Sequence, residues 1–260
     1  MPTKLNPTPV LFTPPKTTGP TTKSTWFHRA SVAIGSTTIL FSLTKAIYTP
    51  TDSHTRLKTL IAGFFGYLIA DLISGIYHWL IDNYGDASTP FVGSHIEAFQ
   101  GHHSLPWAIT KREFASNLHV GARVITYLTV PANMMWHENP VVMGFVGVAG
   151  GGMMFGSQIH AWAHVSRGKL PAVVVALQDV GVFVRQSEHA RHHLPPYDGG
   201  YCVVSGVWNR VLDEYKVFLG LEKVVFFLFG VKPRSWSEGN SGGGATAAVT
   251  AEDYFETSPP

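Results

Sequence analysis

The chain reads Ser187-Glu-His189-Ala-Arg-His192-His193 near residue 190, with three imidazoles within five residues. On one helical turn His189 neighbours both His192 and His193, because residues three and four positions apart share a face. Such a turn can give two imidazoles to one metal and the third to another metal nearby. Imidazole binds iron, copper, zinc and nickel. The alternative to a metal site is a polar turn that faces solvent. A metal site requires a fold that brings further ligands to this turn.

Three other segments supply such ligands. His160 and His164 repeat the four-residue spacing, and two histidines are adjacent at 102 and 103. The carboxylate of Asp82 follows His78 by four residues. Eight imidazoles are more than one metal needs, so their number favours two metals with Asp82 orienting or bridging them. The candidate metal ligands are His78, His102, His103, His160, His164, His189, His192 and His193.

The composition is typical of a membrane protein. Apolar residues make up 45% of the 260 residues and charged residues only 14%, which is low for a soluble chain. The net charge of +2 is too small to argue for a nucleic-acid partner. One cysteine, Cys202, excludes an intrachain disulfide and a multi-thiolate metal site. Any metal is therefore held mainly by nitrogen and oxygen.

Apolar stretches predict about four transmembrane helices, since about 20 apolar residues cross a bilayer as a helix. The second stretch carries Asp71 and His78, and ionisable groups inside a span are usually functional. Pro131 is expected to shorten the third, and small residues in the fourth, at Gly147xxxGly151 and Gly152xxxGly156, predict close helix packing. The four stretches cover residues 26–48, 60–80, 121–136 and 140–159.

Four spans bring every histidine segment to one membrane face, because the second and fourth spans both end on the side of the N-terminus. Residues 83–117 are expected to form a loop region, and the apolar runs 170–184 and 217–231 to lie in the membrane interface. We therefore predict an all-α membrane protein with a di-metal site capped by interfacial helices on one face. The expected divisions are a disordered or transit-like segment 1–25, a membrane-embedded domain 26–234 and a disordered tail 235–260.

The ligand types point to redox chemistry on a lipid. Zinc does no redox chemistry, so a nitrogen-rich dinuclear site beside a bilayer favours iron and activation of O2. An unactivated methylene has no acidic proton, so a general base cannot activate an acyl chain.

Desaturation and hydroxylation begin with the same abstraction of a hydrogen atom, so the sequence leaves both reactions open. A haem- or zinc-binding membrane protein is the non-enzyme alternative, although haem leaves at least half of the eight histidines unexplained. The sequence also leaves open whether Asn117 or His119 completes the metal shell.

The same segments resemble the Kua-type lipid desaturases in order and spacing over about residues 25 to 238. The plant plastid branch is the most similar, through Ile81-Asp-Asn-Tyr-Gly-Asp86, Tyr201-Cys-Val-Val-Ser-Gly206 and Lys232-Pro-Arg-Ser-Trp-Ser-Glu238. The ligand-bearing segments that carry the resemblance are Asp71-Leu-Ile-Ser-Gly-Ile-Tyr-His78-Trp, Glu97-Ala-Phe-Gln-Gly-His102-His103, Gln158-Ile-His160-Ala-Trp-Ala-His164, Leu177-Gln-Asp179 and His189-Ala-Arg-His192-His193.

The resemblance implies that the eight histidines bind two iron ions, that Asp82 is a catalytic acidic position, and that Asp71 and Asp179 match acidic positions of unsettled role. It implies a trans double bond at carbon 3 of palmitate on phosphatidylglycerol, made with O2 and, we expect, electrons from a ferredoxin. A thylakoid or envelope membrane of the chloroplast is the expected location, with the endoplasmic reticulum membrane as the alternative. Desaturation of a plasmanyl ether lipid by the same site is the alternative reaction.

Overall fold

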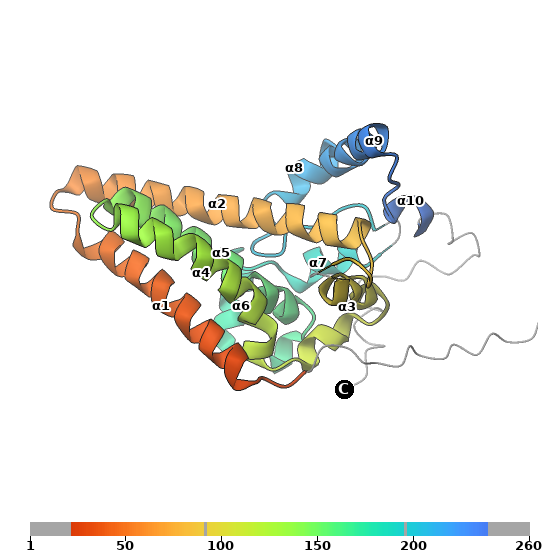
Figure 1. Cartoon of the computed structure of the whole chain (residues 1–260), viewed down its shortest axis with the longest axis horizontal. Helices are drawn as coiled ribbons and strands as arrows, with labels where there is room; N and C mark the ends of the chain where they lie inside the picture. Colours follow the sequence, from red (N-terminus) through yellow and green to blue (C-terminus); the bar gives the residue numbers. More distant parts are fainter. Residues whose placement is uncertain (1–21, 91–92, 195–196, 239–260) are drawn as a thin grey trace, which may run out of the picture.

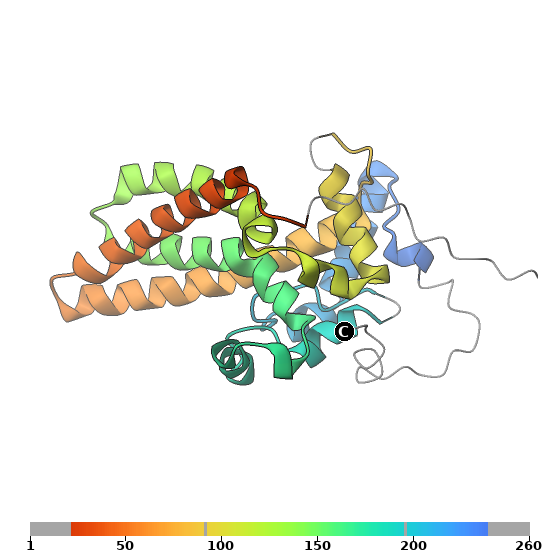
Figure 2. The same ribbon diagram turned by 90° about the horizontal axis from the view of Figure 1, so that it is seen from below.

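The computed structural model describes residues 22–90, 93–194 and 197–238, and over these residues it contains helices and loops without strands (Figure 1). This confirms the predicted all-α fold. The body is a bundle of four long helices, namely α1 (Trp26–Tyr48), α2 (Ser53–Asn83), α4 (Phe114–Trp136) and α5 (Pro140–Ala163). Shorter elements gather at one end of the bundle (Figure 2). They are α3 (Gly93–Ser104), η1 (Pro106–Lys111), η2 (Arg167–Lys169), α6 (Ala172–Asp179), α7 (Gln186–His192), α8 (Asn209–Glu214), α9 (Val217–Phe229) and α10 (Ser235–Glu238).

Three of the long helices, α1, α2 and α5, are long and apolar enough to cross a membrane. The fourth, α4, has 23 residues and packs against α1 and α5. Its composition is more polar because it contains Asn117, His119, Arg123 and Asn133. The prediction of about four spans therefore corresponds to three helices with the composition of a span and a fourth member of the same bundle.

Two local predictions differ from the structure. Helix α4 continues through Pro131 to Trp136 instead of being shortened there. Proline removes one intrahelical hydrogen bond. Near the end of a helix, packing against neighbouring helices compensates for the free-energy cost of this loss. The segment 83–117, predicted as loop, contains α3 and η1, and η1 begins at Pro106. Helix α3 carries buried Ile96 and His102, so tertiary packing stabilises a segment whose own sequence reads as polar.

Glycines set the close approach of α2 and α5. A Cβ atom added at Gly66 would lie 2.7 Å from the carbonyl oxygen of Phe145, and one added at Gly144 would lie 2.9 Å from that of Thr59. Only a residue without a side chain fits such contacts between helix backbones. The glycines predicted for close packing contribute unequally. A Cβ atom added at Gly152 would lie 2.7 Å from that of Ala70 on α2, and one added at Gly147 would lie 2.7 Å from Leu43 on α1, whereas Gly151 and Gly156 meet nothing closer than 3.8 Å. Close contacts between the two helices thus hold α2, which carries His78, against α5, which carries His160.

The C-terminal helices are tied to the bundle through one buried carboxylate. Glu222 of α9 accepts hydrogen bonds from the indole Nε1 atoms of Trp79 at 3.3 Å and Trp236 at 2.8 Å. The last turn of α9 exposes Phe227, Leu228 and Phe229, as expected for a helix at a membrane interface. The predicted segments 1–25 and 235–260 lie mostly outside the described residues.

Candidate metal centre

All eight candidate ligands and Asp82 lie together where α2, α3, α5 and α7 meet. Within each of two adjacent groups, one ligand atom per residue lies within 4.8 Å of all the others. Every member is buried except His103, which is partly exposed. The first group is His102, His160, His164, His189 and His193, and the second is His78, Asp82, His103 and His192.

The five-histidine group directs its Nε2 atoms toward one another. The Nε2 atom of His102 lies 3.1 Å from that of His160. The Nε2 atom of His189 lies 2.9 Å from that of His164 and 3.1 Å from that of His193. A neutral imidazole has one donor and one acceptor nitrogen, so five converging nitrogens cannot all satisfy each other with protons. A metal cation can accept all five lone pairs, and the donor set fits one.

The charge state of these imidazoles suits a metal. Burial lowers the pKa of His102, His189 and His193 well below the usual value of histidine, and neighbouring imidazoles lower it further. These side chains are therefore neutral at pH 7. A neutral imidazole keeps the lone pair through which histidine binds metals.

The second group surrounds the carboxylate of Asp82. Its Oδ2 atom lies 3.2 Å from Nε2 of His78, 3.0 Å from Nε2 of His103 and 3.3 Å from Nε2 of His192. The other oxygen, Oδ1, is buried and has no hydrogen-bond partner among the described residues. Three imidazoles and one carboxylate with an unsatisfied oxygen fit a divalent iron ion.

Backbone carbonyls orient two of these ligands. The Nδ1 atom of His78 lies 3.0 Å from the carbonyl oxygen of Tyr201, and that of His192 lies 2.8 Å from the carbonyl oxygen of Gly199. A carbonyl only accepts, so each Nδ1 carries the proton and each Nε2 keeps the lone pair that faces Asp82. No side-chain pattern in the sequence marks this role of Gly199 and Tyr201, because every residue has a carbonyl.

Asp71 lies outside both groups and holds the loop that supplies these carbonyls. It is fully buried, and its Oδ1 atom accepts the backbone N–H groups of Val204 at 3.2 Å, Ser205 at 2.7 Å and Gly206 at 3.0 Å. The ionisable group that the sequence marked inside the second span thus binds the backbone next to Tyr201.

Replacing Asp71 by asparagine should therefore lower the thermal stability of the protein. An amide oxygen is neutral, and loss of charge-assisted hydrogen bonds in a buried site is expected to destabilise by about 3 kcal/mol. The measurement is the melting temperature in detergent, with Asp179→Asn as the control, because Asp179 is exposed. An unchanged melting temperature for Asp71→Asn would contradict the structural role of this carboxylate.

The remaining candidates lie elsewhere. The amide of Asn117 donates to the carbonyl oxygen of Ser157 at 3.0 Å, and the ring of His119 stacks on His28 at 3.9 Å. Asp179 forms a two-pronged ion pair with Arg167 at 2.6 Å. None of Asn117, His119 and Asp179 belongs to either group of potential ligands.

Phe99 forms part of the wall of the centre. Its ring centroid lies 5.6 Å from that of His78 and 6.1 Å from that of His160. His95 at 4.9 Å and Tyr77 at 6.0 Å also contact this ring. This apolar ring thus packs against one ligand of each group, in accord with the dry pocket that an oxidative site requires.

Comparison with known proteins places this geometry in a family. A model described as "Lipid desaturase domain" matches residues 67–236, which include both ligand groups. Fatty acid desaturase 4, chloroplastic, of Arabidopsis thaliana is 55% identical over 217 residues, 84% of this chain and 67% of that protein. Plasmanylethanolamine desaturase 1 of Mus musculus is 32% identical over 193 residues, 70% of each chain. No solved structure matches significantly. The chain belongs to the lipid desaturase family.

Proposed function

We propose that this protein is a membrane-bound, O2-dependent di-iron desaturase that introduces a trans double bond at carbon 3 of palmitate on phosphatidylglycerol. The observation that carries the proposal is the pair of adjacent donor groups, one of five imidazoles and one of three imidazoles with a carboxylate. Iron held there would supply the redox chemistry by which O2 is reduced to two waters with two hydrogens from the acyl chain and two electrons and two protons from outside. We propose a ferredoxin as the electron donor.

The protein residues contribute orientation and exclusion of water. The carbonyls of Gly199 and Tyr201 fix the tautomers of His192 and His78. Asp82 adds a negative charge to the second group, which helps to hold a cation among neutral imidazoles. The Phe99 ring covers ligands of both groups and helps to keep water from the reacting carbons.

The relatives support an acyl lipid as the substrate. Three Arabidopsis proteins named as chloroplastic fatty acid desaturases are 50% to 55% identical, whereas the mouse plasmanylethanolamine desaturase is 32% identical. By the same comparison we propose a multi-pass protein of a chloroplast membrane, either thylakoid or envelope. A trans product follows if the two hydrogens leave an acyl chain held extended. Carbon 3 lies close to the headgroup, so only a short straight length of chain must enter the site.

Lipid analysis tests this function. The protein should be expressed in a host whose phosphatidylglycerol carries palmitate, together with a plant-type ferredoxin. The expected product is a trans-3-hexadecenoyl chain confined to phosphatidylglycerol. A vinyl ether on ethanolamine lipids, a mid-chain cis bond or a hydroxylated chain would contradict the proposal and assign the site to one of the alternative reactions.

A further inference from the structure

Arg112 is a partly buried cation for which the described part of the chain supplies no partner. Arg112 directly follows η1 and is partly buried. Its guanidinium group makes no hydrogen bond and no ion pair with any residue in the described ranges. Burial also lowers the pKa of this guanidinium below its usual value. A charge that water solvates poorly gains more from an anionic partner than an exposed charge does.

Neighbouring cations of the same end of the protein are already engaged. Arg167 binds both carboxylate oxygens of Asp179 at 2.6 Å. Arg185 donates to the backbone carbonyl oxygens of Gln178 at 3.1 Å and Asp179 at 2.8 Å. These two arginines would have to give up good partners to bind an anion, and Arg112 would not.

Two more basic side chains near Arg112 lie in water. Lys111 is exposed, with its ammonium group 5.9 Å from the ring centroid of Trp107. Lys169 is exposed as well. The carboxylate beside Arg112, that of Glu113, is occupied by the backbone N–H of Ser24 at 2.8 Å. No acidic side chain therefore neutralises Arg112 from the adjacent position.

Arg112 lies close to the wall of the metal centre. Burial lowers the pKa of His95 to about 4, and the charge of Arg112 is the next largest cause. The ring of His95 lies 4.9 Å from that of Phe99, and the ring of Phe99 lies 6.1 Å from that of the ligand His160. Arg112 therefore acts electrostatically on a residue that contacts the Phe99 wall of the metal centre.

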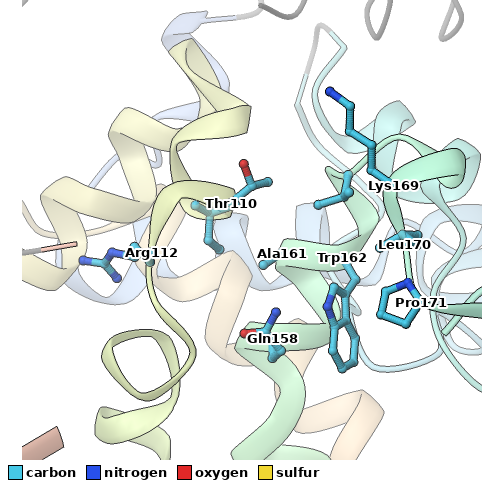
Figure 3. A pocket seen from close by; sticks show the side chains of 10 residues that line it. Thr110, Arg112, Gln158, Ala161, Trp162, Lys169, Leu170 and Pro171 are labelled. Atoms are coloured by element: carbon cyan, nitrogen blue, oxygen red, sulfur yellow. The ribbon is translucent and has the colours of Figure 1, made fainter. Parts of the chain in front are cut away.

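A pocket with a volume of about 180 Å³ adjoins Arg112 (Figure 3). Gln158 and Trp162 from the ligand-bearing end of α5 form one wall, and Pro171 contributes an apolar surface. Figure 3 shows Arg112 and Lys169 at opposite ends, with both cationic heads pointing away from the middle of the pocket. This combination of polar and apolar groups with cations at the rim suits the polar end of a phospholipid.

We propose that Arg112 binds the phosphate of the phospholipid substrate and thereby sets which acyl carbon reaches the metal centre. This inference rests on the proposed function. A guanidinium can bind two phosphate oxygens at once, which fixes the position of the phosphate as well as attracting its charge. Glycerol and one ester link the phosphate to the first acyl carbons, so a phosphate held at Arg112 brings these carbons toward the Phe99 wall. A slip by one methylene would present the wrong carbon to the oxidant.

The first test compares Arg112→Gln with Lys111→Gln, which removes the same charge from the exposed neighbouring residue. Both variants are expressed with ferredoxin in the phosphatidylglycerol-palmitate host. Arg112→Gln should lower the carbon-3 product by at least about tenfold, the loss expected for one charge-assisted hydrogen-bond pair. Part of the remaining product should carry its double bond at another carbon or on another headgroup. Lys111→Gln should stay within about twofold of the wild type.

The second test measures binding without turnover. Purified wild type and variants are incubated with vesicles of equal parts phosphatidylglycerol and phosphatidylcholine that carry the same acyl chains, and co-purified lipid is quantified by mass spectrometry. The wild type and Lys111→Gln should enrich phosphatidylglycerol, and Arg112→Gln should lose at least about fivefold of this enrichment. If Arg112→Gln does not fold, Arg112→Lys carries the test, because a lysine keeps the charge without the two-pronged geometry and should lose part of the enrichment.

Equal enrichment by the wild type and both Arg112 variants would overturn the inference, whatever the product analysis shows. Inorganic phosphate that raises the melting temperature of the wild type in detergent, but not that of Arg112→Gln, while it leaves the enrichment of phosphatidylglycerol unchanged would overturn it as well, by assigning Arg112 to a free anion and not to the lipid. If the wild type makes no carbon-3 product but still enriches phosphatidylglycerol through Arg112, the proposed reaction fails and the binding role stands.

Discussion

The substitution His160→Ala should abolish desaturation. His160 belongs to the five-histidine group, and its Nε2 atom lies 3.1 Å from that of His102 on a different element. Removing one imidazole opens a buried site and weakens metal binding by more than about 100-fold, since loss of an outer partner alone weakens it by 10- to 100-fold. Product formation in the host lipids and the iron content of the purified variant measure this effect.

His193→Ala should give the same result, because His193 belongs to the same group. Matched controls are His54→Ala and His137→Ala, which remove imidazoles that belong to neither group. His54 is exposed, and His137 lies 3.8 Å from Glu138 in a solvent-facing pair. Both controls should keep wild-type activity. Full activity in His160→Ala or His193→Ala would remove that residue from the ligand set.

A second large effect is expected for Asp82→Asn, in the iron content as well as in activity. Asp82 is the one carboxylate within the two groups and faces three imidazole nitrogens at 3.0 to 3.3 Å. An amide has nearly the same shape without the negative charge, so the second group should lose its metal. The five-histidine group, which does not include Asp82, should keep its own. The expected result is about one iron per chain and no desaturation.

Elemental analysis with Asp179→Asn as the control separates this effect from a general loss of carboxylate charge, because Asp179 pairs with Arg167 on the surface. Two irons per chain in Asp82→Asn would show that the carboxylate is not needed to hold either metal. Loss of both irons would mean that the two groups bind their metals as one unit.

Much of the fold follows from the sequence because long apolar stretches leave few alternatives. Helix α1 coincides with the first predicted stretch, and α2, α4 and α5 each include one of the other three. Packing was harder to predict. The sequence of α3 predicts a loop, because the contacts that stabilise this helix are made with distant parts of the chain. Helix α4 begins at Phe114, before the predicted start at residue 121, and it continues through Pro131 because bundle packing outweighs one lost hydrogen bond.

Sequence spacing also explains part of the site. Residues four apart on a helix share a face, and the pairs His160/His164 and His189/His193 each lie within one group. Adjacent residues diverge by about 100° on a helix, and His192 accordingly faces the second group while His193 faces the first. The neighbours His102 and His103 divide in the same way. That all these residues are metal ligands remains a prediction.

The partners that orient the ligands could not be predicted from the sequence. The carbonyls of Gly199 and Tyr201 are backbone groups, and their positions depend on a loop held by Asp71, more than 120 residues earlier in the chain. The sequence marked Asp71 as unusual because an acid inside a span is costly. Only the structure shows that three backbone N–H groups of the loop share one of its oxygens.

Elemental analysis of the purified wild-type protein tests the central claim most directly. The two donor groups together predict two iron ions per chain, with no stoichiometric zinc. Two irons in the wild type, falling to about one in Asp82→Asn, would agree with the account. One zinc and no iron per chain would contradict it and would favour a structural metal site in place of a redox centre.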